Sequence, residues 1–164
     1  MKVRPATPDD AATVSAILAA SYPALMRGAY DQALLVRALP LITRANPHLL
    51  ASGTYYIAFE GSEAVACGGW SHRPPEADRG EPGLAHIRHF ATHPDWTGRG
   101  AGRAIFERCE AEARAAGFRR FICYSSRNGE PFYAALGFRR VREILVPMGP
   151  QLRFPSILMV REIG

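Results

Sequence analysis

The sequence of 164 residues contains no long apolar run, and it has only one lysine and only three cysteines. No apolar stretch approaches the roughly 18 residues that a membrane-spanning helix needs. The first ten residues, MKVRPATPDD, reach proline and acidic residues at once, so they lack the apolar core of a signal peptide. From these absences we expect a cytoplasmic protein with no membrane partner.

The cysteines are three in number, widely spaced, and contain no CxxC pair. An odd number without paired spacing argues against both a disulfide framework and a zinc site. Cys67 and Cys123 lie in apolar runs, and Cys109 lies on the apolar face of a predicted helix. We therefore expect three buried, inert thiols and no metal.

Lys2 is the only lysine, and the formal net charge of +5 rests on arginine. This bias, with abundant alanine, glycine and proline, is typical of a GC-rich bacterial genome. Arginine binds phosphate well, so the excess charge would suit nucleic acid or an anionic cofactor. The longest basic cluster is only RRVR at 139–142, with no interleaved aromatic residues. A nucleic-acid partner is therefore the least favoured of our hypotheses.

A chain of this length is typical of one domain, and we expect residues 1–164 to form it. Turn residues and apolar periodicity first predict a strand at 2–6, a helix from Thr7 to about Pro23, helices within 31–51 broken by Pro40 and Pro47, and strands at 54–60 and 64–71. After a loop at 73–83 they predict a strand at 84–92, a helix at 100–116, a strand at 118–124, a short helix at 130–136, and strands at about 138–147 and 152–162. This order predicts a mixed α/β layered domain.

A glycine-rich turn joins the strand at 84–92 to the helix that follows it. Its sequence is TGRGAGR, with Gly98, Gly100 and Gly102 at alternate positions. A helix N-terminus carries unpaired N–H groups and a partial positive charge, and glycines let an anion approach the backbone closely. The dinucleotide-binding pattern GxGxxG in an N-terminal βαβ unit is not met, so we expect a site for another phosphate group.

A second motif begins 25 residues after Arg103, and it consists of Asn128 and the segment FYAALGF at 132–138. Together with FATHP at 90–94 and TGRGAG at 97–102, it resembles the GNAT superfamily of acyl-CoA-dependent N-acetyltransferases. The resemblance covers essentially the whole chain, because the order of elements also matches. Thr97 departs from the Gln or Arg that the family carries at the start of its pyrophosphate motif.

The resemblance implies an α/β (α+β) fold: a mixed, mostly antiparallel, twisted sheet of about seven strands with about four flanking helices. Two central parallel strands, at about 84–92 and 118–124, should splay apart and admit the pantetheine arm of acetyl-CoA, the co-substrate. The residues implied to contact acetyl-CoA are Phe90, Ala91, Thr92, Thr97, Gly98, Arg99, Gly100, Ala101, Gly102, Arg103 and Asn128.

In this family an amine attacks the thioester directly, and a tyrosine protonates the departing thiolate. Tyr133 occupies the tyrosine position, and its ordinary pKa of about 10 is close to that of a thiol. Several relatives place a basic carboxylate where this chain has His86, which titrates near neutral pH. Strand alternation would put His86, Arg88, Phe90 and Thr92 on one face. A purely structural His86 is an equally open interpretation.

The acceptor should be the primary amine of a small molecule or of a peptide. We expect its pocket between residues 22–50 and the loops at 71–84 and 147–155, and no acidic cluster there suits a polyamine. The residues that could line it are Tyr22, Met26, Tyr30, Tyr55 and Trp70, and most of them would serve equally well in the core. A catalytically weak acyl-CoA-binding sensor and a nucleic-acid-binding module are the alternative functions, and both a monomer and a homodimer stay open.

Overall fold

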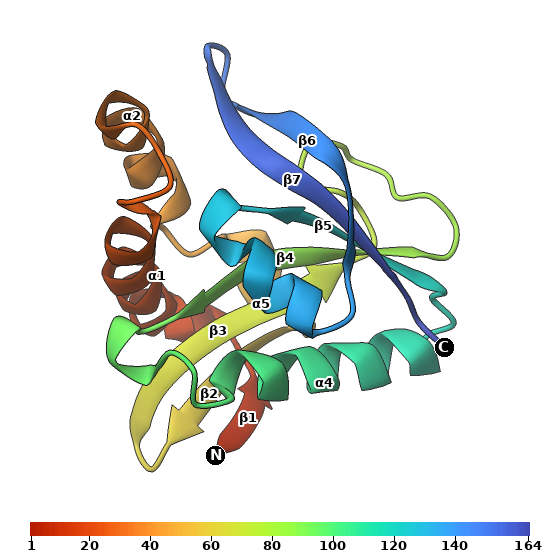
Figure 1. Ribbon diagram of the computed structural model, residues 1–164. Coiled ribbons are helices and arrows are strands. Elements are labelled where there is room, and N and C mark those ends of the chain that lie inside the picture. The colour runs from red at the N-terminus through yellow and green to blue at the C-terminus, as the bar shows by residue number, and fades with distance from the viewer.

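The computed structural model describes residues 1–164 and is built on one seven-stranded sheet (Figure 1). The strands are β1 (Lys2–Pro5), β2 (Tyr55–Glu60), β3 (Glu63–Ser71), β4 (Leu84–Thr92), β5 (Arg120–Ser125), β6 (Arg139–Met148) and β7 (Leu152–Glu162). Their order across the sheet is β1-β2-β3-β4-β5-β7-β6, and β4 and β5 are the only parallel neighbours. The fold class predicted from the sequence is thereby confirmed.

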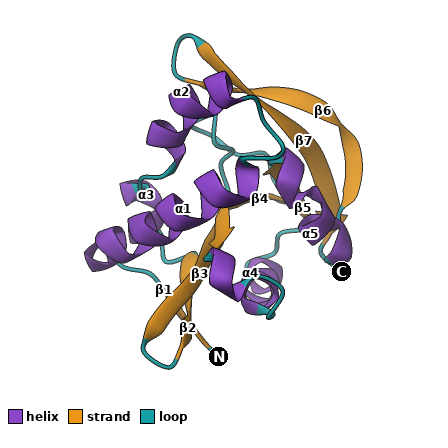
Figure 2. Ribbon diagram, turned by 60° about the vertical axis from the view of Figure 1, so that its left-hand side comes forward, coloured by secondary structure: helices purple, strands orange, loops and turns teal.

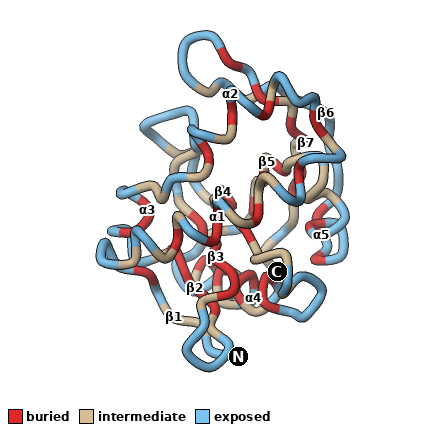
Figure 3. The backbone as a smooth tube through the Cα atoms, turned by 90° about the vertical axis from the view of Figure 1, so that its left-hand side faces the viewer, coloured by how far each residue is buried: buried red, intermediate tan, exposed pale blue.

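Helices cover both faces of the sheet (Figure 2). They are α1 (Ala11–Met26), α2 (Gln32–Ile42), α3 (Pro47–Ala51), α4 (Ala101–Ala115) and α5 (Glu130–Ala135). The largest apolar cluster lies between the sheet and α4 with α5, and a second lies between the sheet and α1 with α3. Figure 3 shows buried backbone at the centre and exposed backbone along much of β6, the last strand of the sheet. None of the helices combines the length and apolar character needed to cross a bilayer.

Prolines account for the main differences from the predicted helix boundaries. We predicted an end to the first helix near Pro23, but α1 continues to Met26, whose side chain is buried. Likewise α2 contains Pro40 and ends at Ile42. A proline removes one backbone hydrogen bond, and here the packing of the next turn compensates for it. Pro47 opens α3, where its missing N–H costs nothing.

The pairing between β4 and β5 is short. It covers Leu84 with Arg120, Ala85 with Phe121, and His86 with Ile122, and no later pair forms. Beyond His86, β4 continues to pair with β3, while β5 continues to pair with β7. The two strands therefore splay apart, as predicted, and the edge of β4 that faces β5 has no strand partner from Ile87 onward.

Candidate active site

The N-terminus of α4 lies just beyond the end of β4. Gly98 has φ +75° and Gly100 has φ +87°, a left-handed conformation that favours glycine. The first hydrogen bond of the helix runs from the Ala104 N–H to the Gly100 carbonyl, at 3.0 Å. The N–H groups of residues 101–103 precede it and have no acceptor within the helix, so they form an anion-binding end.

The start of α4 packs closely against α5. A Cβ atom on Gly102 would lie only 2.8 Å from the Phe132 ring, so the lack of a side chain at Gly102 lets α4 and α5 approach each other. The Arg103 guanidinium donates to the Ala135 carbonyl at 3.3 Å. The guanidinium of Arg99 stacks on the Trp96 ring, 4.8 Å from its centroid. The two sequence motifs are therefore in direct contact.

A cavity of about 690 Å³ runs from this helix start through the split between β4 and β5. Its lining continues to the C-terminal end of α1 and to residues of β6 and β7. The predicted site residues that line it are Phe90, Ala91, Thr92, Thr97, Gly98, Gly100, Ala101, Gly102, Arg103, Asn128 and Tyr133. Arg99 and His86 do not line it.

A β-bulge in β4 corrects the predicted strand alternation. Ala91 pairs with Cys67 and Arg88 with Gly69, so β4 has one residue more than β3 between these pairs. Each residue after the bulge therefore points to the face of the sheet opposite to the one that simple alternation predicts. Phe90 packs against the α4 side with Tyr133, whereas Ala91 joins the core under α1. The prediction that Phe90 shares a face with His86 and Arg88 is therefore wrong.

His89, at the bulge, has φ +46° and is the only non-glycine residue with positive φ. Tyrosine hydroxyls hold the bulge in place. Tyr55 donates to the His89 carbonyl at 2.7 Å, and Tyr22 donates to the Phe90 carbonyl at 3.0 Å. Such strain persists where surrounding contacts fix it, and it is common at functional sites. Sequence reasoning missed this feature because no turn residue marks it.

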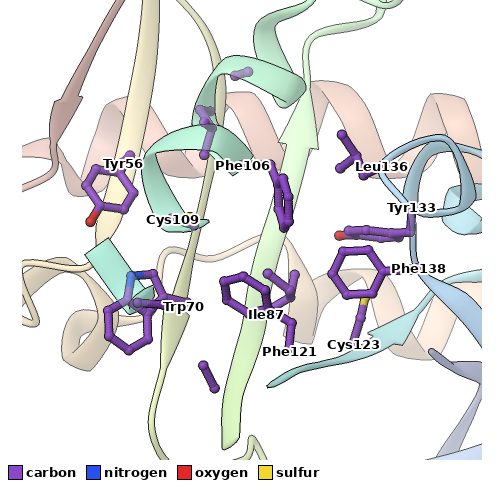
Figure 4. Packing of buried hydrophobic residues seen from close by; sticks show 14 of the residues in the cluster. Tyr56, Trp70, Ile87, Phe106, Cys109, Phe121, Cys123, Tyr133, Leu136 and Phe138 are labelled. Carbon is purple, nitrogen blue, oxygen red and sulfur yellow. The ribbon is translucent and has the colours of Figure 1, made fainter. Parts of the chain in front are cut away.

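Tyr133 projects from α5 into the cavity, and its hydroxyl points toward β4 (Figure 4). Its ring packs against Phe90 and Phe138, with centroids 6.1 and 5.5 Å away. Burial and the nearby Cys123 thiol raise the pKa of Tyr133 well above its usual value, so the hydroxyl keeps its proton. The Asn128 Oδ1 atom is buried and has no hydrogen-bond partner, although the residue lines the cavity.

The two histidines of the strand differ in access to the cavity. His86 is 6% exposed and packs edge-on against Tyr124, with ring centroids 6.1 Å apart. His89 lines the cavity. Burial lowers the pKa of each to about 4, so both are neutral at pH 7.

The residues predicted to line the acceptor pocket separate into two groups. Tyr22 and Met26 line the cavity. Tyr55 and Trp70 lie in the core instead, and Tyr30 packs on Phe154 and donates to a backbone carbonyl. For these three residues the core interpretation holds.

Coenzyme A fits the residues present in three respects. The helix start offers unpaired N–H groups at residues 101–103, and the open space beside Gly98 and Gly100 lets a pyrophosphate approach them. The free edge of β4 can pair with an extended chain that carries amides. The orphaned Asn128 oxygen can accept a hydrogen bond from such an amide.

Comparisons with known proteins agree with this geometry. A family model described as "Acetyltransferase (GNAT) family" matches residues 18–138. No curated protein matches the chain.

Among solved structures, a GCN5-related N-acetyltransferase from Rhodopseudomonas palustris is 23% identical, with a TM-score of 0.80 over 98% of this chain and 94% of its own. The PaiA N-acetyltransferase of Thermoplasma acidophilum, in complex with coenzyme A, is 14% identical, with a TM-score of 0.74 over 98% of both chains. Ard1 from Thermoplasma volcanium is 15% identical, with a TM-score of 0.69 over 99% of this chain and 97% of its own. At these identities the likeness concerns the fold.

Proposed function

The chain belongs to the GNAT acetyltransferase family, and we propose that it moves an acetyl group from acetyl-CoA to a primary amine by direct attack in a ternary complex. The observation that carries this proposal is the continuous cavity that joins the N-terminus of α4, the split between β4 and β5, and an apolar pocket beyond it. We also infer that residues 1–164 act as one domain, since the sheet is continuous from β1 to β6.

The cofactor assignments follow from the polar groups along the cavity. We assign the pyrophosphate to the backbone of residues 97–103, with Arg99 and Arg103 as nearby cations. We assign the pantetheine arm to the free edge of β4 at residues 90–92 and to Asn128. The free strand edge and the orphaned Asn128 oxygen support these assignments.

Direct attack is favoured because the chain offers no activated thiol. All three cysteines are buried, and Cys123 is the one that lines the cavity. Burial raises the pKa of Cys67 to about 12, and it also raises the pKa values of Cys109 and Cys123. A nucleophilic cysteine needs a lowered pKa and access to solvent or substrate. The acceptor amine therefore attacks the thioester carbon itself, forming the C–N bond as the C–S bond breaks.

Tyr133 is the proposed general acid. Its raised pKa keeps the hydroxyl protonated at neutral pH, and its hydroxyl points toward β4, along which we place the pantetheine arm. The departing sulfur takes this proton, and solvent restores it to the tyrosinate. A positioned acid of this kind typically contributes a rate factor of about 10²–10⁴.

The amine must lose a proton when it attacks, and we propose that His86 is the base that accepts it. Because His86 does not line the cavity, the proton would reach it through a water molecule. His89 is the alternative because it does line the cavity. The pH–rate profiles of His86→Ala and His89→Asn distinguish them. The variant that lacks the base loses most rate at low pH, where the amine is most protonated, and an unchanged profile assigns that histidine a structural role.

An acceptor screen that reads thiol release from acetyl-CoA tests the proposed function. It covers amino acids, simple amines, aminoglycosides and peptides, and mass spectrometry identifies the product. We expect amine-dependent release of one thiol for each N-acetylated product. If the protein binds acetyl-CoA but no amine causes thiol release, its function is that of an acyl-CoA-binding sensor and not of an enzyme.

A further inference from the structure

Arg88 is a buried cation that lacks a carboxylate partner. It lies in the central strand β4 and is 6% exposed. Its only hydrogen bond runs from Nη1 to the Ser71 hydroxyl, at 2.9 Å. Its Nε–H is buried without a partner, and no carboxylate lies within 4.0 Å of the guanidinium. Buried charges are almost always paired, so this arrangement calls for an anion.

The neighbouring charged groups do not fill this role. Glu76 acts on Arg88 through space but forms no ion pair with it; its carboxylate accepts a hydrogen bond from the Tyr124 hydroxyl at 2.7 Å, and its side chain is exposed. Arg73 lies 3.6 Å from Asp78 and adds positive charge near Arg88. The Nε and Nη2 edge of the Arg88 guanidinium is therefore free of protein partners. This edge presents two parallel N–H groups, the geometry that binds a carboxylate in a bidentate manner.

Arg88 lines the same cavity as the proposed cofactor site, but on the acceptor side. Arg88 precedes Thr92 by four residues of β4. At the rise per residue of an extended strand, Arg88 lies on the order of 10 Å before the turn that leads to the pyrophosphate-binding residues. The preceding residue, Ile87, packs in the cluster under α4, so strand alternation places the Arg88 side chain on the opposite face of β4, away from α4. The phosphates of coenzyme A therefore do not reach it, and the anion must belong to the acceptor.

The rest of the acceptor side is apolar. No aspartate or glutamate lines the cavity, and Arg88 and Arg103 are its only arginines. Arg103 lies at the pyrophosphate end. The apolar wall on the acceptor side comes from α1, α2, β6 and β7, and it consists of Leu25, Met26, Ile42, Val146, Met148 and Phe154. A polycationic acceptor finds no partner here, whereas an apolar molecule with one negative charge does.

We propose that Arg88 binds the carboxylate of the acceptor, and that the acceptor is a carboxylate-bearing amine with an apolar body, such as a free amino acid with an apolar side chain. This inference deepens the proposed function and rests on it. Arg88 is a specificity-determining residue in this account, because it discriminates among acceptors and takes no part in the proton transfers.

The first test measures binding without turnover. N-acetyl-leucine, N-acetyl-methionine and N-acetyl-phenylalanine, with their amides, are titrated calorimetrically into protein saturated with coenzyme A. We expect at least one carboxylate to bind about tenfold to a hundredfold more tightly than its amide, the range expected for hydrogen bonds to a charged group. Equal binding of every pair, or no binding by any carboxylate, overturns the proposal.

Three variants assign the effect to this side chain. Arg88→Met should bind both ligands of a pair equally, and Arg88→Lys should keep part of the preference because it retains charge without the planar fork. Arg79→Met is the control, since it removes an equal charge from an exposed loop position outside the cavity. An apolar residue of similar size can replace a buried charge without loss of stability, so Arg88→Met should fold and bind coenzyme A normally. A preference that survives in Arg88→Met overturns the proposal.

Turnover separates this proposal from the proposed function. The matched acceptors are leucine, methionine and phenylalanine with their amides, and the readout is thiol release from acetyl-CoA. We expect the preference for a carboxylate to appear in KM and to disappear in Arg88→Met. Release that is equal for both members of each pair contradicts the role of Arg88 and leaves the transferase intact. Carboxylate binding without release from any acceptor refutes the transferase and leaves the anion site intact.

Discussion

Tyr133 is the single residue on which the proposed chemistry depends most. Tyr133→Phe removes the hydroxyl and keeps the ring that packs on Phe90 and Phe138. We expect kcat to fall about a hundredfold or more, because the leaving thiolate loses its proton donor. Stability should change by no more than about 1 kcal/mol, and calorimetry should show unchanged binding of coenzyme A.

Acyl donors with a more acidic thiol should restore part of the rate of Tyr133→Phe, since a better leaving group needs less protonation. A wild-type kcat in this variant would reduce Tyr133 to a packing residue.

At the scale of the element, α4 offers a test of the anion site with an internal control. Gly100 precedes this helix and Gly117 follows it, and both have φ +87° with open space where a Cβ would lie. Glutamate at either position should cost about 1–2 kcal/mol for the left-handed backbone. Only Gly100→Glu places a negative charge where the pyrophosphate is proposed to bind.

Thermal shift measures the difference between the two glycine variants. At a hundredfold excess over its Kd, acetyl-CoA should stabilise the wild type and Gly117→Glu by about 2.7 kcal/mol, and it should leave Gly100→Glu unchanged. An equal shift in both variants would remove the turn from the site.

The elements that sequence reasoning predicted well are those with local signals. The glycine-rich turn at 97–103 marks the start of α4, as predicted, whereas Pro47, which we predicted only as a break, starts α3. The bulge at His89 has no such signal, because tyrosines from β2 and α1 hold it in place. It inverts the second half of β4, so the alternation rule failed within the site itself.

Arg88 illustrates a different limit of the sequence. An arginine in the middle of a central strand is unusual enough to attract attention. Its lack of a carboxylate partner, however, depends on the loop and strands packed around it, and no sequence pattern records that.

At the scale of the whole molecule, the two buried histidines predict acid lability. Burial lowers the pKa of His86 and of His89 from 6.5 to about 4. Between these values the unfolded chain binds protons that the folded protein excludes, so stability falls as the pH falls from 6.5 toward 4 and is unaffected by these groups above that window. Each histidine contributes a loss of about 3 kcal/mol.

Urea denaturation between pH 4 and 8 measures this dependence. His86→Gln and His89→Asn should each flatten the curve, and asparagine suits the positive φ at position 89. A curve in the double variant as steep as that of the wild type would show that other groups cause the loss.

Intact-protein mass spectrometry with quenched product analysis tests whether acetyl transfer to the amine occurs within one ternary complex. Protein mixed with acetyl-CoA alone should keep its mass and release no thiol, because burial raises the pKa of each of its three thiols and leaves them protonated. On addition of the amine, coenzyme A and the N-acetylated amine should appear together in equal amounts. A protein that gains one acetyl group before the amine is added, and then passes it on, would contradict the account.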